Sequence, residues 1–257
     1  MSPSYWQAYD HYAYALVVGV GTVIAVVASH GFMSRSRWSG WFRSLAGVAP
    51  PFINIVGVLF GLTLAFLAND TWTAHDRAIG AVLHEADSIH TLAVLSDAFD
   101  PAAGQGFRAA LVGYKEVLVA EWPRLARGDT DPAVGRQGDL LLSLAAARTL
   151  GEAAGPTLQR AMLEQVIELR ASRDLRIGLS QTHVNPLKWL GMAFLGFLTL
   201  ISVAVVHAAD PRAALIAIIL FALAAAPTCA IVLIHGNPFQ PPSAVSPQPI
   251  AEALGTP

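Results

Sequence analysis

Four side chains that could bind a metal ion or move protons lie close together in the stretch HEADSIH: His84, Glu85, Asp87 and His90. Histidine nitrogens and carboxylate oxygens are common zinc ligands. A zinc-binding helix carries two histidines four residues apart, so that they stack on one face. His84 and His90 are six residues apart, or about 240° around a helix. We therefore expect no metal and no cofactor here, and we interpret these side chains as surface and helix-packing groups.

A second polar group, Arg173, Asp174 and Arg176, lies near the end of the charged middle of the chain. We interpret these residues as anchors at a membrane surface, or as partners of Asp70 and Asp76. No candidate nucleophile stands beside a base, and no Gly-rich phosphate loop follows a strand. The sequence therefore predicts that the protein is not an enzyme.

Composition indicates the class of protein that must position these residues. The chain is 54% hydrophobic and 13% charged, with mean hydropathy +0.50, whereas soluble domains have about 25% charged residues. Most charges lie between Asp70 and Arg176, so the middle is polar and both ends are apolar. The net charge of −2 and the lack of a basic block exclude nucleic acid as a partner. Cys229, the single cysteine, lies in an apolar run and is expected to be buried.

Four apolar segments are long enough to cross a bilayer, which takes roughly 20 residues of α-helix. They are Tyr12–Ser29, Phe52–Asn69, Leu187–Val206 and Ala213–Ile234. The first resembles a signal peptide only in part, because nothing basic precedes it, and we interpret it as an uncleaved anchor. Membrane lipid is therefore an expected partner.

The polar middle is predicted to be helical, because apolar residues recur there at spacings of three and four and no alternating pattern competes. The fold class expected is an all-α membrane protein with four transmembrane helices and a helical extramembrane domain inserted between spans two and three. The domain boundaries are residues 1–69 for the first two spans, 70–185 for the helical domain continuous with helix 2, 186–236 for the last two spans, and 237–257 for a Pro-rich, extended tail with a short helical turn.

The second span runs directly into the polar region. No Gly or Pro lies between Gly61 and Ala78, so nothing there ends a helix. We expect one helix from Phe52 to about Ile89, some 55 Å long. That is nearly twice the roughly 30 Å of the hydrocarbon core.

The same span carries a line of small residues ending in a bulky one. The line consists of Asn54, Gly57, Gly61, Ala65, Ala68 and Trp72. Small residues allow helices to approach closely in lipid, so we expect a helix-packing face at Gly57, Gly61 and Ala65. Its partner is either another span of the same chain or another subunit. Asn54, Thr63 and Asn69 are polar at membrane depth, and either a pore or a neighbouring helix can satisfy them.

Several motifs, in this order and at this spacing, resemble the uncharacterised bestrophin-like membrane proteins of bacteria. The family's Ala-Phe, Trp and Glu-Ala occur in LAFLANDTWTAHDRAIGAVLHEADSI. Its Tyr and Glu-Trp occur in YKEVLVAEWPRLARG. Its spaced arginines, and the Pro and Trp that follow them, occur in RASRDLRIGLSQTHVNPLKWLG. NPF follows the last span. The residues that match the family motifs are Trp72, Glu85, Glu121, Trp122, Arg173, Arg176, Pro186, Trp189, Pro238 and Phe239.

The resemblance implies kinship to bestrophins, which are pentameric anion channels. The function that it implies is an oligomeric inner-membrane ion channel conducting an inorganic anion, with the chain forming a homo-oligomer. Pore or gate candidates in span two are Asn54, Phe60, Phe66 and Asn69. The alternative is a non-conducting signalling or scaffold protein whose helical domain binds a partner.

Two arguments about topology disagree. Arg35, Arg37 and Arg43 lie in the loop between spans one and two, and Arg212 precedes span four. The positive-inside rule places these loops in the cytoplasm and the helical domain in the periplasm. Kinship to bestrophins implies the opposite, because their large domain is cytosolic. We favour the first argument, which places the helical domain in the periplasm.

Overall fold

The described part of the chain consists of α-helices and their connections, without a strand. This computed structural model describes residues 10–35, 40, 44, 49–98, 101–181 and 186–255. The chain divides into two units. The membrane unit comprises Met1–Trp72 and Val184–Gly236, and the helical domain comprises Thr73–His183 and Asn237–Pro257. The all-α prediction is confirmed for these residues.

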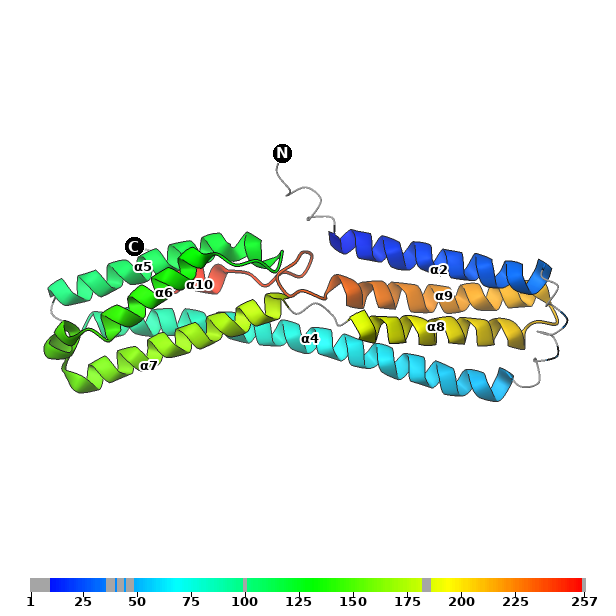
Figure 1. The fold of residues 1–257 in the computed structure, drawn as a ribbon, viewed down its shortest axis with the longest axis horizontal. Helices are drawn as coiled ribbons and strands as arrows, with labels where there is room; N and C mark the ends of the chain where they lie inside the picture. The colour runs from blue at the N-terminus through cyan, green and yellow to red at the C-terminus, as the bar shows by residue number, and fades with distance from the viewer. Residues whose placement is uncertain are drawn as a thin grey trace, which may run out of the picture. The chain divides into compact units, whose positions relative to one another are not determined.

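The membrane unit contains α2 (Asp10–Arg35), the first half of α4 (Ala49–Ser96), α8 (Pro186–Val206) and α9 (Pro211–Ile234), shown in Figure 1. Among the residues that the structure describes, three helices, α4, α8 and α9, are long and apolar enough to cross a membrane. The α2 helix covers the predicted first span with a shorter apolar stretch, Ala15–Gly31. It packs against α9 and α8.

An aromatic contact anchors α4 within the membrane unit. The rings of Phe60 on α4 and Phe221 on α9 lie 5.7 Å apart between centroids. Gly196 on α8 allows Phe60 to approach closely, because a Cβ at that position would lie 3.0 Å from the Phe60 ring. Cys229 is buried beside them, as predicted.

The α4 helix is one unbroken helix of 48 residues, Ala49–Ser96. This confirms the prediction of a single helix from Phe52 to about Ile89. At 1.5 Å per residue its length is about 72 Å, more than twice the roughly 30 Å hydrocarbon core. Its residues up to Trp72 belong to the membrane unit, and those from Thr73 belong to the helical domain.

In the helical domain, the second half of α4 is joined by α5 (Pro101–Leu125), α6 (Pro132–Ala145) and α7 (Arg148–Gln181). Asp131 caps α6 by accepting a hydrogen bond from the Ala133 amide. Gly155 interrupts α7 with φ of 78°, a conformation that glycine adopts without steric cost. Pro156 follows and lies in the first turn of the long part of α7, where a proline costs no helical hydrogen bond.

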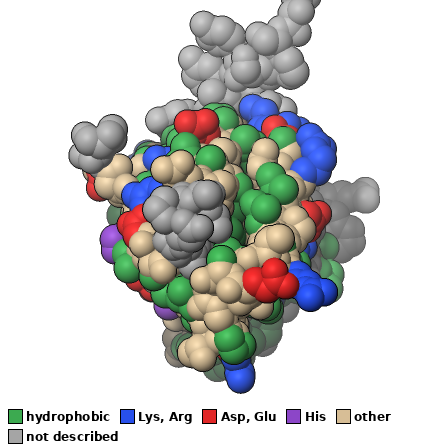
Figure 2. All heavy atoms as spheres, turned by 90° about the vertical axis from the view of Figure 1, so that its left-hand side faces the viewer, with side chains coloured by type: hydrophobic (Ala, Val, Ile, Leu, Met, Phe, Trp, Pro, Cys, Tyr) green, Lys and Arg blue, Asp and Glu red, His purple; other side chains and the backbone are tan. Residues whose placement is uncertain are grey.

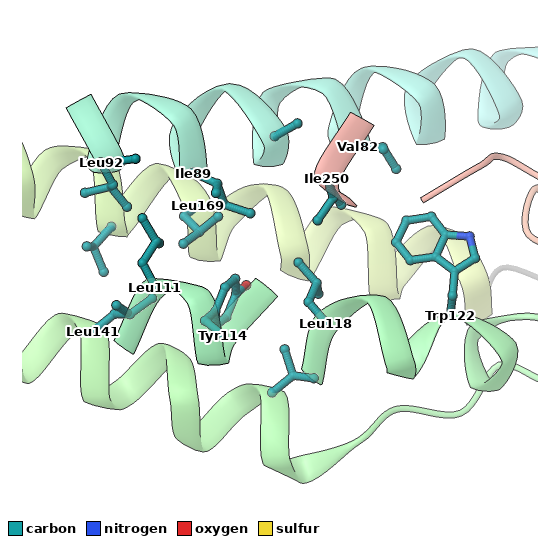
Figure 3. Close-up of a cluster of buried hydrophobic side chains, with 14 of the residues drawn as sticks. Val82, Ile89, Leu92, Leu111, Tyr114, Leu118, Trp122, Leu141, Leu169 and Ile250 are labelled. Atoms are coloured by element: carbon teal, nitrogen blue, oxygen red, sulfur yellow. The ribbon is translucent and has the colours of Figure 1, made fainter. Parts of the chain in front are cut away.

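The apolar faces of these helices meet in one core (Figure 3). Its fully buried side chains include Ile89, Leu111, Leu118, Leu141 and Leu169. Burying each such side chain contributes about 1.5–3 kcal/mol. The core thus fixes the helices that carry the polar residues described below.

The C-terminal segment is not an extended tail, so that prediction is wrong. Phe239, Val245 and Ile250 are buried in the core of the helical domain, because their apolar surface gains more from burial than from extension into water. The predicted short helical turn is present as α10 (Gln248–Glu252). The Asn237 amide donates to the carbonyls of Leu125 and Ser180 at 3.3 and 3.1 Å, which closes the C-terminal ends of α5 and α7.

Candidate functional site

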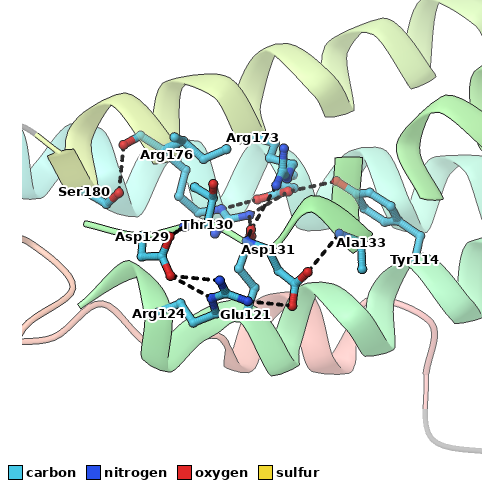
Figure 4. A network of polar contacts seen from close by, with 12 residues as sticks. Tyr114, Glu121, Arg124, Asp129, Thr130, Asp131, Ala133, Arg173, Arg176 and Ser180 are labelled. Atoms are coloured by element: carbon cyan, nitrogen blue, oxygen red, sulfur yellow. Dashed lines mark hydrogen bonds and ion pairs between the residues drawn. The ribbon is translucent and has the colours of Figure 1, made fainter. Parts of the chain in front are cut away.

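A cluster of buried polar side chains joins α4, α5 and α7 in the helical domain (Figure 4). It consists of Glu85, Tyr114, Glu121, Arg173 and Arg176. Arg176 Nε lies 2.8 Å from Glu85 Oε2, and Arg176 Nη2 lies 3.4 Å from Glu121 Oε2. Arg173 Nη2 lies 2.9 Å from Glu121 Oε1. Two carboxylates and two guanidinium groups thus balance each other in the interior.

Burial sets the protonation of this cluster. The side chains of Glu85, Glu121 and Arg176 have no exposed surface. Burial raises the pKa of the Glu85 carboxyl, and the Arg176 guanidinium beside it opposes that rise. Burial, and then the Glu85 carboxylate, raise the pKa of Tyr114 well above its ordinary value. The Tyr114 hydroxyl therefore stays protonated and donates to Glu85 Oε1 at 3.2 Å.

Aromatic and backbone groups complete the surroundings of Arg176. Its guanidinium lies 5.0 Å from the centroid of the Trp122 ring, in the range of a cation–π contact. The Trp122 ring meets Phe239 edge-on at 5.6 Å, and its indole N–H donates to the Val245 carbonyl at 2.8 Å. Glu121 also accepts from the Asp131 amide at 2.7 Å. The cluster therefore connects α4, α5, the start of α6, α7 and the C-terminal segment.

The interpretation of Arg173 and Arg176 as membrane-surface anchors or partners of Asp70 and Asp76 is wrong. Arg176 is fully buried and pairs with two glutamates, because a guanidinium removed from water needs a carboxylate partner. Asp70 instead pairs with Lys188 at 2.7 Å. Asp174 is exposed, as that interpretation expected of a surface group.

Of the four titratable residues of HEADSIH, three are exposed and one is not. His84, Asp87 and His90 lie at the surface, while Glu85 is buried in the charge cluster. In the described ranges no group of three His, Cys, Asp or Glu side chains is arranged to hold a metal ion. A signal for the burial of Glu85 was present: it lies three residues after Val82 and four before Ile89, on the apolar face of α4.

The surface of the helical domain carries mixed charge. On the face that Figure 2 shows, Lys and Arg side chains lie interspersed with Asp and Glu. The pairs Arg148–Glu152 and Arg160–Glu164 are solvent-exposed ion pairs of neighbouring helical turns, which contribute little to stability. This face offers no large area of a single sign of charge.

The pore candidates on α4 differ in their surroundings. Phe66 is 66% exposed, and Asn54 and Asn69 are also exposed. Phe60 is buried against Phe221, so its ring is occupied inside the protomer. Six residues, or about 240° of helix, separate Phe60 from Phe66, so the two rings lie on different faces of α4.

The small-residue line of α4 is largely uncovered in the described part of the protomer. A Cβ atom added to Gly57 or Gly61 would have no atom within 4 Å, apart from those of its two chain neighbours and of the nearby helix backbone. Ala65 is exposed. Ala68, further along, is buried in the membrane unit. The described residues therefore leave Gly61 and Ala65 open to a partner.

A second line on α4 was missed in the sequence. Large apolar side chains recur at alternating spacings of three and four, and each is between 47% and 66% exposed. These residues, which we term the α4 seam, are Phe52, Ile55, Leu59, Leu62 and Phe66. Such spacing keeps a line of side chains on one face of a helix. The middle of the seam lies about 120° around the helix from Gly61 and Ala65, so the two lines border the uncovered side of α4.

The remaining motif residues are distributed over both units. Trp72 is 60% exposed, and Trp189 lines a cavity in the membrane unit. Pro186 begins α8. Pro238 and Phe239 are buried in the helical domain. Arg37 and Arg43 lie outside the described residues.

A family model for the bestrophin-like domain matches residues 20–250. The chain belongs to the bestrophin-like family. This confirms the resemblance found in its motifs, of which Glu85, Glu121, Arg173 and Arg176 meet in the buried charge cluster and Trp122 lies against it. No curated protein matches the chain.

Solved structures share the fold of this bestrophin-like protein. A crystal structure of a membrane protein aligns with a TM-score of 0.60 at 15% identity, covering 96% of this chain and 99% of that one. Two crystal structures of variants of a bacterial bestrophin homologue from Klebsiella pneumoniae align with TM-scores of 0.59 and 0.58, at 16% and 14% identity. Each alignment covers 95% of this chain and 96% of the homologue.

Proposed function

We propose that this bestrophin-like protein is the subunit of a homo-oligomeric channel in the cell inner membrane that conducts an inorganic anion. Membership of the family and the shared fold support a channel architecture. The observation that carries the proposal is the uncovered half of α4. It presents the seam and the small-residue line across the length of a membrane span.

When copies of α4 surround a central axis, the small-residue line and the α4 seam have separate roles. Close approach at Gly61 and Ala65 packs one copy against the next, because backbone contact drives helix association in lipid. The seam then faces the axis and forms an apolar constriction at Phe66, which gates by dewetting. The amide groups of Asn54 and Asn69 donate hydrogen bonds to an anion on either side of it. Five copies are expected by kinship to bestrophins.

Charges near the end of the span are compatible with anions. Asp70 would repel an anion if it stood alone, but Lys188 pairs with it at 2.7 Å. Arg77, one helical turn from Thr73, is exposed and adds positive charge on α4. The Asp70 carboxylate is therefore compensated, and Arg77 offsets in part the exposed carboxylate of Asp76 beside it.

Ion flux tests the proposal directly. Liposomes containing the purified protein are loaded with chloride or potassium, and efflux is measured under equal gradients. Chloride flux above that of empty liposomes, and above potassium flux, is the expected result. If neither ion moves in either direction, the channel proposal fails and the non-conducting scaffold replaces it.

Assembly through the small-residue line gives a separate prediction. Gly61→Leu should weaken the oligomer by about 1–3 kcal/mol per contact, because the added side chain overpacks the interface. Within the described protomer the new Cβ meets nothing, so folding of the single chain should be unchanged. Gly191→Leu on α8, equally open and exposed, is the matched control. Mass in detergent measures the outcome, and equal oligomer mass for both variants would show that Gly61 is not at an interface.

We also propose that the helical domain is periplasmic, as the positive charges of the short loops favour. Arg127 is an exposed residue in the turn after α5 and suits a labelling site. Gly128 beside it has φ of 67° and tolerates a side chain poorly. Arg127→Cys should react with a membrane-impermeant thiol reagent in whole cells, while the wild type with buried Cys229 serves as the blank. Protection of the new cysteine until lysis would place the domain in the cytoplasm.

A further inference from the structure

A large apolar cavity lies within the membrane unit, lined by α2, α8 and α9 and by Phe60 of α4. Its volume is about 620 Å³, within the range of roughly 300–1,000 Å³ typical of ligand sites. An apolar cavity of about 150 Å³ already holds a benzene molecule. The space is therefore large enough for a long hydrocarbon chain.

One residue of the cavity lining carries an unsatisfied hydrogen-bond donor. The indole Nε1 of Trp189, which lines the cavity, is buried and lacks a hydrogen-bond partner in the described protein. A buried donor without an acceptor costs free energy, so we expect the Trp189 ring to turn its N–H toward the cavity when an acceptor from outside the protomer is present. Thr22 adds a single hydroxyl to the lining, and water needs two to four polar partners to fill such a site.

The position of Trp189 along α8 indicates how deep in the membrane that acceptor lies. It lies in the first turn of α8, which begins at Pro186. The preceding residue, Lys188, makes its ion pair with Asp70 at the surface, with each side chain 55% exposed. Tryptophan prefers this interfacial depth, where the ring is in an apolar layer and the N–H meets polar groups. In a phospholipid, ester carbonyls lie between the headgroup and the hydrocarbon chains.

We propose that this cavity binds one acyl chain of a membrane phospholipid, whose ester carbonyl accepts a hydrogen bond from Trp189 Nε1. The apolar lining takes the chain, and the single donor fixes the end of the chain at the interface. Binding uses residues of one protomer and requires neither assembly nor conduction. The site is therefore independent of the channel proposal.

Native mass spectrometry of the full-length protein tests the site. The protein is delipidated in mild detergent and titrated with palmitoyl-oleoyl-phosphatidylglycerol. We expect the wild type to retain one phospholipid per protomer. Ala225→Phe, which fills the cavity, should abolish retention, whereas Ala224→Phe, on the exposed side of α9 and outside the lining, should preserve it. Helical content by circular dichroism confirms that both variants are folded.

A second variant tests the hydrogen bond. Trp189→Phe keeps an aromatic ring but removes the donor, so affinity for the phospholipid should fall roughly five- to tenfold, the effect of one hydrogen bond. The exposed Trp72→Phe is the matched control and should bind as the wild type does. In protein labelled with ¹⁵N-tryptophan, the resonance lost in Trp189→Phe should be the one that shifts during the titration.

Three results would overturn the proposal. They are the absence of retained phospholipid in the wild type, equal retention by Ala225→Phe and the wild type, and an indole resonance of Trp189 that does not respond to lipid. A fall in oligomer mass for Ala225→Phe with unchanged lipid retention would instead show that a second copy of the chain covers the cavity.

Discussion

Replacing Arg176 with methionine is expected to unfold the helical domain or bring it close to unfolding. Methionine fills a similar volume but leaves Glu85 buried without its nearest cation. Removing one partner of a buried ion pair costs about 3–5 kcal/mol, and a typical domain has only about 5–15 kcal/mol of stability. Thermal melting in detergent, together with hydrogen exchange of α5 and α7, measures the loss.

A surface ion pair provides the control for this prediction. Arg160→Met breaks an exposed pair with Glu164, whose side chains are 81% and 62% exposed. That change should cost no more than about 1 kcal/mol. Adding Glu85→Gln to Arg176→Met should restore part of the lost stability, because the unpaired carboxylate is removed. If Arg176→Met melts like Arg160→Met, the cluster does not stabilise the domain.

The helices themselves could be predicted from local features of the sequence. Apolar length identified α8 and α9, and the lack of a helix-ending residue after Gly61 predicted the continuity of α4. These features act within a single segment, so they need no knowledge of neighbours. The C-terminal segment shows the limit of composition. Its prolines restrict the backbone, but they do not determine whether Phe239 and Ile250 find a core to enter.

The charge cluster could be predicted only in part. Glu85, Glu121 and Arg176 each occupy positions on the core-facing side of their helices, where the spacing of three and four would place apolar residues. That pattern could have indicated burial. It could not have identified the pairs, because Arg176 lies 91 residues from Glu85 and 55 from Glu121. Only the packing of α4, α5 and α7 brings them together.

The faces of α4 raise a similar problem. The angle between Phe60 and Phe66 around the helix places the two rings on different faces. It does not say which ring enters the core. Phe221 and the space above Gly196 decide that Phe60 does. Which of the open lines faces an axis depends on other copies of the chain, so it remains a proposal for experiment.

Phe66→Ala is expected to increase chloride flux about tenfold, which corresponds to a barrier lowered by about 1.4 kcal/mol. Phe66 is the most exposed member of the α4 seam, at 66%. It lies about one turn from Asn69 on the same side of the helix. Shortening its ring to a methyl group widens the apolar constriction, so water and chloride can enter it more readily. Flux from liposomes with equal protein content measures the effect.

Phe194→Ala is the matched control, because Phe194 is an aromatic residue of α8 with 59% exposure that lies off the α4 seam. Its loss should leave flux unchanged, since nothing places it near the axis. Phe60→Ala should instead lower stability by about 3–5 kcal/mol through a buried cavity, because its ring packs on Phe221. Equal chloride flux in Phe66→Ala and Phe194→Ala would remove Phe66 as the gate. It would leave the rest of the seam, at Phe52, Ile55, Leu59 and Leu62, as the next positions to shorten.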